Sequence, residues 1–331
     1  MVAITSRRPT AQRPDVLVGG LIAIGALVLV AYATVSGNTR FGETGDSYPG
    51  WFTAAAAPTG YFLTTMLASL TFGGLLYVTL CARPAKDGTI GVETYRAHRI
   101  ASRAALAWLI ASLIMSVVTA ADRAGQPVGR MIADAHVWSF IDASEQSIAW
   151  LVSAFCALLV TVFLRLYLTW ATHAILLLYA ATGAVALPVA GNAGQGPGHD
   201  FTTTAVIVFA TAATVLGGLK IAAALTLTRD TPVDDRRTSL QRVVIVALVA
   251  DAAALIYGLI LVGFLVPLQY LFTSAYGRWA LVAAIGLIVG TVADVVLIRG
   301  VRRARDTDHD PVPSATSRLL LVGAAAAVLT M

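Results

Sequence analysis

Residues 243–266 read VVIVALVADAAALIYGLILVGFLV, an apolar run whose single charged side chain is that of Asp251. A helix that crosses the hydrocarbon core of a bilayer needs about 20 such residues. In the whole chain of 331 residues, 57% are hydrophobic and 12% are charged, and the mean hydropathy is +0.77. Soluble domains carry roughly 25% charged residues. The composition therefore excludes a soluble enzyme and a disordered chain, and the run predicts a membrane-spanning helix.

Seven further apolar runs of spanning length lie between charged loops, and none alternates as a strand would. An open sheet could not satisfy its backbone in lipid. A ninth run, Leu319–Met331, is too short to cross a bilayer at a rise of about 1.5 Å per residue, so we expect it to begin a further span of a longer chain. The sequence predicts an all-α, polytopic transmembrane helical bundle with eight full spans and a truncated ninth. The full spans are expected at 15–36, 59–81, 101–121, 147–168, 173–190, 203–227, 243–266 and 279–298.

Lysine and arginine residues are distributed unequally between alternate loops. Of the 23 such residues, all but Arg40, Arg123, Arg130 and Arg278 lie on one side of the predicted spans. Cytoplasmic loops hold the excess of lysine and arginine, so we expect a cytoplasmic N-terminus and a multi-pass protein of the plasma membrane. The basic residues are spread over short loops without a continuous basic face, so the expected surroundings are a lipid bilayer and not nucleic acid.

The predicted spans divide the chain into three parts. Residues 1–58 hold an additional N-terminal helix and an outer loop, in which Trp51 and Phe52 are placed at the lipid headgroups. Residues 59–305 hold the main transmembrane bundle. Residues 306–331 hold a charged linker and the start of a further span.

Two further patterns predict how helices pack. In the outer segment 122–146, five apolar side chains fall on one helical face, which predicts one helix that lies on the outer surface or caps the bundle. These side chains are those of Val128, Met131, Ile132, Ala135 and Trp138. Small residues inside the spans predict close approach of neighbouring helices. They are Gly73-Gly74, Gly217-Gly218, and Gly286 with Gly290.

Motifs of soluble catalysis are absent from the sequence, which has no P-loop, nucleophile elbow, H-E-x-x-H or C-x-x-C. We therefore expect no enzymatic activity and no bound nucleotide. Haem ligation within a bundle would want facing pairs of histidines. Of the 5 histidines, only His173 borders a predicted span, whereas His98 and His309 fall in inner loops and His136 and His199 in outer ones. No haem is therefore expected.

Asp251 is the candidate functional residue within a span. A carboxyl group at this depth costs about 3 kcal/mol unless it is paired, neutral or facing water. It is either an ion or proton site on a transport pathway, or a protonated acid hydrogen-bonded to a neighbouring helix. Lys220 and Asp294 lie nearer the inner ends of their spans, where their side chains can reach the headgroups. We expect these two residues to be structural.

A sparse set of candidate metal ligands lies on the outer side. His199 and Asp200 follow a glycine-rich loop, and the preceding outer segment contributes Met131 and His136. Imidazole and thioether groups suit copper better than magnesium or calcium. The candidate metal ligands are therefore His199, His136 and Met131, although each residue taken alone also reads as an ordinary loop residue.

Several stretches resemble the copper resistance protein D (CopD) family. They include LPVAGNAGQGPGHD in 187–200, LGGL in 216–219 and LFTSAYGRWALVAAIGLIVGTVADVVLIRGVRR from Leu271 onward, and DSYPGWFTAAAAPTGYFLTTMLASLTFGGLLYVTL near the start agrees in order. The extra N-terminal helix and the charged tail are similar to the actinobacterial arrangement. In that arrangement a CopD-like half, here 59–305, is fused to a cytochrome c oxidase assembly (CtaG-like) half.

The resemblance implies copper ion transport or uptake across the plasma membrane, with copper ion as the partner. Three positions depart from the family pattern. Asn192 stands where the family has a histidine in a Gly-His-Ala-Ala sequence, and Val208 and Val215 occupy positions that match histidine-containing sequence within the sixth span. The predicted mechanism is capture of copper at the outer face by His199, with His136 or Met131, and passage through the bundle past Asp251.

Two other functions stay open on the sequence. One is a non-transporting assembly or scaffold protein with a degenerate metal site, which supports copper insertion into cytochrome c oxidase and has a CtaG-like domain or oxidase components as partners. The missing histidines favour it. The other is a proton- or sodium-coupled carrier for an unrelated solute, and it rests on Asp251 alone.

Overall fold

The computed structural model describes residues 14–91, 94–134, 137–191, 199–227, 232–265, 268–306 and 313–328. Within these ranges the chain is helical, with isolated bridges but no strand. The helices are α1 (Pro14–Ser36), α2 (Thr39–Thr44), α3 (Trp51–Leu76), α4 (Tyr95–Arg123), α5 (Val128–Ala133), α6 (Val137–Asp142), α7 (Glu145–Leu166), α8 (Trp170–Val189), α9 (His199–Thr226), α10 (Val233–Leu265), α11 (Ala275–Asp306) and α12 (Pro313–Val328). A π-helical turn, η1 (Tyr77–Cys81), extends α3, and a 3-10 turn, η3 (Leu268–Tyr270), precedes α11.

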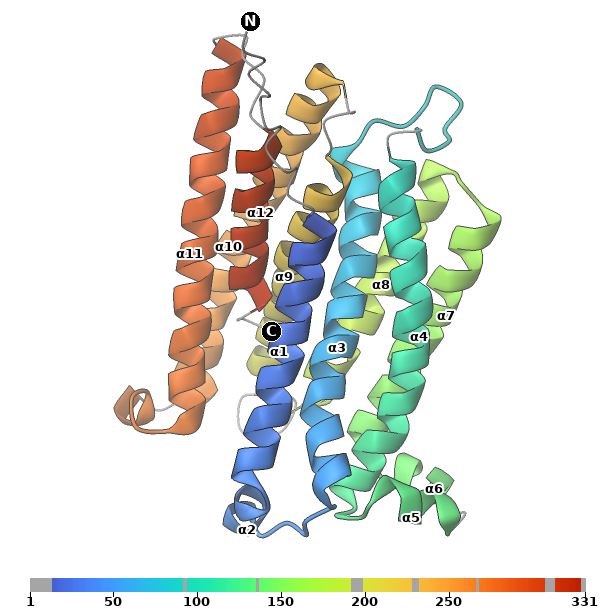
Figure 1. The fold of residues 1–331 in the computed structure, drawn as a ribbon, viewed down its shortest axis with the longest axis vertical. Coiled ribbons are helices and arrows are strands. Elements are labelled where there is room, and N and C mark those ends of the chain that lie inside the picture. Colours follow the sequence, from blue (N-terminus) through green and yellow to red (C-terminus); the bar gives the residue numbers. More distant parts are fainter. Residues whose placement is uncertain are drawn as a thin grey trace, which may run out of the picture.

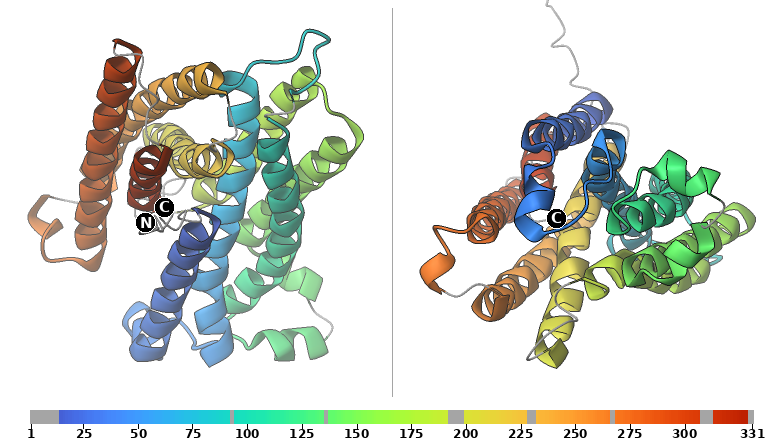
Figure 2. Two further views of the ribbon diagram at one scale, coloured as in Figure 1. Left: turned by 45° about the horizontal axis from the view of Figure 1, so that its top comes forward. Right: turned by 90° about the horizontal axis from the view of Figure 1, so that it is seen from below.

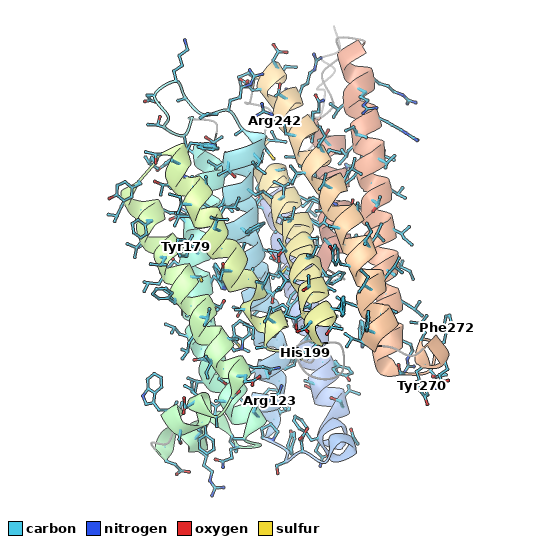
Figure 3. The ribbon with its side chains drawn as sticks, turned by 180° about the vertical axis from the view of Figure 1, so that it is seen from behind. Arg123, Tyr179, His199, Arg242, Tyr270 and Phe272 are labelled. Carbon is cyan, nitrogen blue, oxygen red and sulfur yellow. The ribbon has the colours of Figure 1, made fainter. Side chains whose placement is uncertain are left out.

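Eight helices of the described chain are long and apolar enough to cross a membrane. They are α1, α3 with η1, α4, α7, α8, α9, α10 and α11, so the predicted bundle of eight spans is confirmed. Their connections alternate between the two ends of the bundle (Figure 1). Arg242 and Arg123, predicted to lie inside and outside respectively, are at opposite ends (Figure 3). The end that carries Arg242 is the inner end, and the end that carries Arg123 is the outer end.

The bundle has two groups of helices that meet along α3 and α9. Helices α4, α7 and α8 pack on the α3 side, while α10, α11 and α12 pack on the α9 side. Figure 2 shows the two groups from the outer end, with α3 and α9 between them. Buried residues of both groups form one continuous apolar core. Helix α1 contacts mainly α3, and only 11% of the residues in its apolar stretch are buried.

Glycines let the α3 and α9 backbones touch. A Cβ placed on Gly218 would lie 1.8 Å from the carbonyl oxygen of Ser69, and one on Gly73 would lie 2.0 Å from the carbonyl carbon of Gly218. Neither position has room for a side chain. Gly290 lies against α12, where a Cβ would be 3.7 Å from that of Ala326. The predicted role of small residues in close helix packing is confirmed at these positions.

The N-terminal boundary of the second span was predicted too late in the chain. It begins at Trp51 rather than near residue 59, so that Trp51 and Phe52 belong to α3 and Pro58 lies inside the helix. Proline removes one backbone hydrogen bond, but helices in membranes tolerate it. Both aromatic side chains are still exposed at the outer end.

The outer segment also differs from its predicted single helix. Two short helices, α5 and α6, replace it. Met131 is fully buried, whereas Ile132 and Trp138 are 56% and 74% exposed. The apolar periodicity of one continuous helix therefore gave the wrong face, because the segment breaks between α5 and α6.

The described part of the last apolar run, up to Val328, is helical, but its helix begins earlier than predicted. Helix α12 spans Pro313–Val328, which includes the polar residues before Leu319. Proline is favoured in the first turn of a helix, where its missing N–H needs no partner. Helix α12 packs against α9 and α11. It is shorter than the eight spanning helices.

Candidate functional site

The structure separates the residues predicted to capture copper. His199 is exposed at the start of α9, and its Nε2 lies 3.1 Å from a carboxylate oxygen of Asp200 (Figure 3). Met131 is buried in an apolar cluster with Ala120 and Ile141. His136 lies outside the described residues. Among the described residues no group of three or more His, Cys, Asp or Glu side chains could hold a metal ion, and copper capture at His199 stays a prediction.

Asp251 belongs to a buried ionic cluster, which we call the triad and define as Lys220, Asp251 and Asp294. Their relative exposures are 0%, 1% and 0%. Lys220 Nζ lies 2.8 Å from Asp294 Oδ2, and Asp251 neighbours both of these groups as well as Thr291. The expectation that Lys220 and Asp294 reach the headgroups is wrong, because α9 and α11 turn them toward each other.

Glycines on two helices make room for the lysine of the triad. A Cβ on Gly323 of α12 would lie 3.0 Å from Lys220 Nζ, and one on Gly290 of α11 would lie 3.7 Å from it. The ammonium group is therefore enclosed by backbone from α11 and α12. It cannot extend along its helix to the inner surface, as an unobstructed lysine would.

A second buried polar centre joins His98 of α4 to His173 of α8. His98 Nδ1 lies 3.0 Å from His173 Nε2, and the two residues are 6% and 0% exposed. The ring of Tyr95 stacks on His98 with 5.5 Å between centroids. The sequence interpretation placed His98 in an inner loop and saw no facing pair. Helix α4 in fact begins at Tyr95, a full turn and more before the predicted residue 101, and this brings His98 into the bundle.

The inner ends of α3 and α8 hold His173 in place. Thr169 is the N-cap of α8, and its side chain accepts a hydrogen bond from the backbone N–H of Thr172. The π-helical turn η1 leaves the carbonyl of Thr79 available, and Trp170 Nε1 donates to it over 3.0 Å. Turns of this kind are frequent at functional sites. They fix the first turn of α8, which carries His173.

The hydrogen bonds of the histidine pair determine which nitrogen carries each proton. The Thr169 carbonyl can only accept, so His173 Nδ1, which lies 2.8 Å from it, is the donor. A neutral His173 then has an unprotonated Nε2, which accepts from His98 Nδ1. In a neutral His98 the other ring nitrogen, Nε2, is then unprotonated. A carbonyl that holds the second nitrogen is also the usual support for a metal-ligating histidine.

Two imidazoles suit a copper ion better than magnesium or calcium. Metal–nitrogen distances are about 2 Å, so nitrogens 3.0 Å apart accommodate an ion between them in a bent arrangement. The proton between His98 and His173 must leave His98 Nδ1 when a metal enters, and the unprotonated Nε2 of the same ring can take it. The pair could therefore hold a soft or borderline cation as two neutral imidazoles.

A cavity of about 430 Å³ lies between α3, α4, α7, α8 and α9, on the outer side of the histidine pair. Trp108 lines it and donates from Nε1 to Ser153 Oγ over 3.0 Å. The Trp108 ring packs on Gly183, where a Cβ would lie 2.7 Å from it. Hydroxyl groups also line the cavity, those of Thr64, Thr65, Ser153 and Thr214.

Trp108 and Gly183 separate this cavity from the histidine pair. Trp108 follows His98 by ten residues on α4, and Gly183 follows His173 by ten residues on α8. At about 1.5 Å per residue, the imidazoles lie roughly 15 Å farther toward the inner end. The Trp108 side chain is 1% exposed and lines the inner end of the cavity.

The comparisons with known proteins place a family match over one half of the bundle. Residues 52–200 match the family model described as copper resistance protein D-like, N-terminal domain. This confirms the resemblance inferred from the sequence for the segment from α3 to the start of α9. His98 and His173 both lie inside the matched segment, whereas the triad lies outside it.

Curated relatives come from mycobacteria. A protein of Mycobacterium leprae described as uncharacterized is 39% identical over 273 residues, which are 82% of this chain and 40% of the relative. One from Mycobacterium bovis, with the same description, is 37% identical over 292 residues, 87% of this chain and 42% of the relative. The chain thus spans about two fifths of the length of the curated relatives it matches. No solved structure matches it.

Proposed function

Starting from a chain whose residues 52–200 carry a copper resistance protein D-like N-terminal domain, we propose that this multi-pass protein transports copper ions across the plasma membrane. The observation that carries the proposal is the buried pair of His98 and His173 within the matched segment. Imidazole nitrogens are good copper ligands. No covalent chemistry is part of this function.

In the proposed pathway, copper enters from the outer end and reaches the imidazole pair through the cavity between α3 and α8. His199, which is exposed at the outer start of α9, provides the first contact. Trp108 lines the inner end of the cavity, so in this pathway it must move before an ion can pass. His98 and His173 then hold the ion near the inner end, with the Thr169 carbonyl fixing the orientation of His173.

The copper content of the purified chain tests the site directly. We expect about one copper ion per wild-type chain, because one ion occupies the imidazole pair. His98→Ala and His173→Ala should lower copper affinity by at least about 10-fold, as loss of a ligand or of its support does. His309→Ala is the matched control, since it removes a histidine outside the matched segment. Copper content that is unchanged in both pair variants would contradict the proposed site.

Uptake by cells separates outer capture from inner binding. His199→Ala should slow copper accumulation at low external copper and leave the copper content of the purified protein near the wild-type value. His173→Ala should reduce both quantities. If deletion of the gene leaves cellular copper unchanged, transport is not the function.

The second candidate function is assembly, in which this half supports copper insertion into cytochrome c oxidase and has no transport activity. Val215 favours it, because this apolar residue occupies a buried position in α9 where the family resemblance leads us to expect histidine-containing sequence. A pull-down from membranes with the tagged chain distinguishes the two functions. Enrichment of oxidase subunits, together with normal copper accumulation after deletion, would support assembly over transport.

A further inference from the structure

The triad lies in the part of the bundle that the copper-resistance domain match does not cover. Lys220, Asp251 and Asp294 come from α9, α10 and α11. Asp251 is therefore not an isolated charged residue on one apolar helix. Three helices each contribute one ionisable group at the same depth. Asp251 follows Val243, where the apolar run of α10 begins, by eight residues, or roughly 12 Å. The triad is therefore well inside the hydrocarbon core, which is about 30 Å thick.

The charges of the triad do not cancel when all three groups are ionised. Lys220 and Asp294 form an ion pair at 2.8 Å, which is neutral as a unit. Asp251 then adds one uncompensated negative charge at 1% exposure. The side chains within hydrogen-bonding reach of its carboxyl group are those of Asp294 and Thr291, and neither brings a second positive charge. A buried net charge is strongly unfavourable, so a triad with two carboxylates and one ammonium group needs one further positive charge.

The surroundings of Asp251 favour a proton as that charge over a metal cation. The ionisable groups acting on Asp251 are Lys220 and Asp294, with the Thr291 hydroxyl beside them. The turn η1 also packs against α10, but its Cys81 lies near Arg242, nine residues and roughly 13 Å along α10. Sodium needs several oxygen ligands, and the Lys220 ammonium group beside Asp251 would repel it. A proton needs only the carboxylate.

We propose that Asp251 binds an exchangeable proton, with the Lys220–Asp294 pair as its positioning partner, and that copper crosses the membrane in exchange for it. The exchange for copper rests on the proposed copper transport, whereas proton binding by Asp251 does not. One proton leaves Asp251 when one monovalent copper ion, Cu(I), enters the bundle, so the buried charge stays constant. Lys220 then stabilises the ionised Asp251 while the proton is absent.

Infrared spectroscopy of the full chain in lipid nanodiscs tests proton binding without copper. The wild type should show the carbonyl stretch of a buried protonated carboxylic acid that disappears as the pH rises. Asp251→Asn should lack this signal. Asp294→Asn should lack it as well, because Asp251 then becomes the counter-ion of Lys220. Asp134→Asn, which changes an exposed carboxylate, should retain it. A wild type without the signal, or persistence of the signal in Asp251→Asn, would overturn the proposal.

Proteoliposomes test the exchange. With an acidic lumen, wild-type vesicles should take up external copper faster than vesicles without a pH gradient. Asp251→Asn should take it up at the same rate in both conditions, because it has no proton to exchange. Equal rates in wild-type vesicles would overturn the exchange. If wild-type vesicles take up no copper in either condition, the proposed function fails, and the infrared signal alone decides whether Asp251 binds a proton.

Discussion

At the residue scale, the two polar centres differ in how much the sequence revealed. Asp251 was identified as a candidate because a carboxylate within an apolar run is conspicuous. Its partners were misread, since depth along a helix does not say which face a side chain occupies. Lys220 and Asp294 point into the bundle at 0% exposure, and only the packing of three helices places them beside Asp251.

The histidine pair could not be found by sequence spacing. His98 and His173 are 75 residues apart, in helices that are not consecutive in the chain. The available signal was positional, because His173 begins one predicted span and His98 lies just before another, both on the inner side. That signal became visible only once α4 was extended back to Tyr95, and helix boundaries are among the least certain features of a sequence-based prediction.

The ion pair of the triad gives a stability prediction. Lys220→Met should lower the free energy of unfolding by about 3–5 kcal/mol, because it leaves two buried carboxyl groups without a positive partner. Lys220→Met combined with Asp294→Leu should recover most of this loss, since an apolar pair replaces the ionic one. Thermal unfolding in detergent measures both variants.

An exposed ion pair provides the control for that comparison. Arg83 and Asp235 are 4.0 Å apart with side chains that are 66% and 39% exposed. Arg83→Met should change stability far less than Lys220→Met, because water solvates the remaining carboxylate. Equal losses in the two single variants would show that burial of the triad is not what makes its charges costly.

At the scale of elements, the number and order of spans follow from composition, because lipid requires every spanning segment to be helical and about 20 residues long. The ends of the helices do not follow in the same way. Trp51 and Tyr95 begin their helices before the predicted residues, since polar and aromatic residues can extend a helix beyond the hydrocarbon core. The short helices α5 and α6 depend on contacts with α4 and α7 that periodicity does not contain.

The contact between α3 and α9 predicts a sharp effect of one methyl group. Gly218→Ala should destabilise the bundle by about 3 kcal/mol, because its Cβ would overlap the Ser69 carbonyl and overpacking forces the backbones apart. The folded yield after extraction and the apparent melting temperature measure this effect. Gly300→Ala on α11 is the control, as no atom lies within 4 Å of its Cβ, and it should behave as the wild type.

At the scale of the whole molecule, the alternation of loops predicts which cysteine substitutions react from each side of the membrane. Ile132→Cys in α5 should react with a membrane-impermeant maleimide on intact cells. Lys86→Cys, in the loop between η1 and α4, should react only after permeabilisation. Both wild-type cysteines, Cys81 and Cys156, are buried, so the background should be low.

The reverse pattern of labelling would invert the orientation derived from the basic loops. Labelling of both positions on intact cells would mean that one of the intervening connections is wrong. The unsubstituted protein serves as the control, and labelling of it would show that Cys81 or Cys156 becomes accessible in cells.

The backbone contact at Gly73 and Gly218 has a mechanical consequence for a protein that moves an ion. At Gly73 and Gly218 no side chain separates the two backbones, so we expect α3 and α9 to move together as one rigid unit. Relative motion of the other helices then takes place on either side of this unit. The helices that carry His98 and His173 lie on one side, and those that carry Asp251 and Asp294 lie on the other. Lys220 belongs to α9 and therefore to the rigid unit itself. A tilt of α10 and α11 relative to α9 would therefore change the Lys220–Asp294 distance first, and the ion pair would resist that tilt.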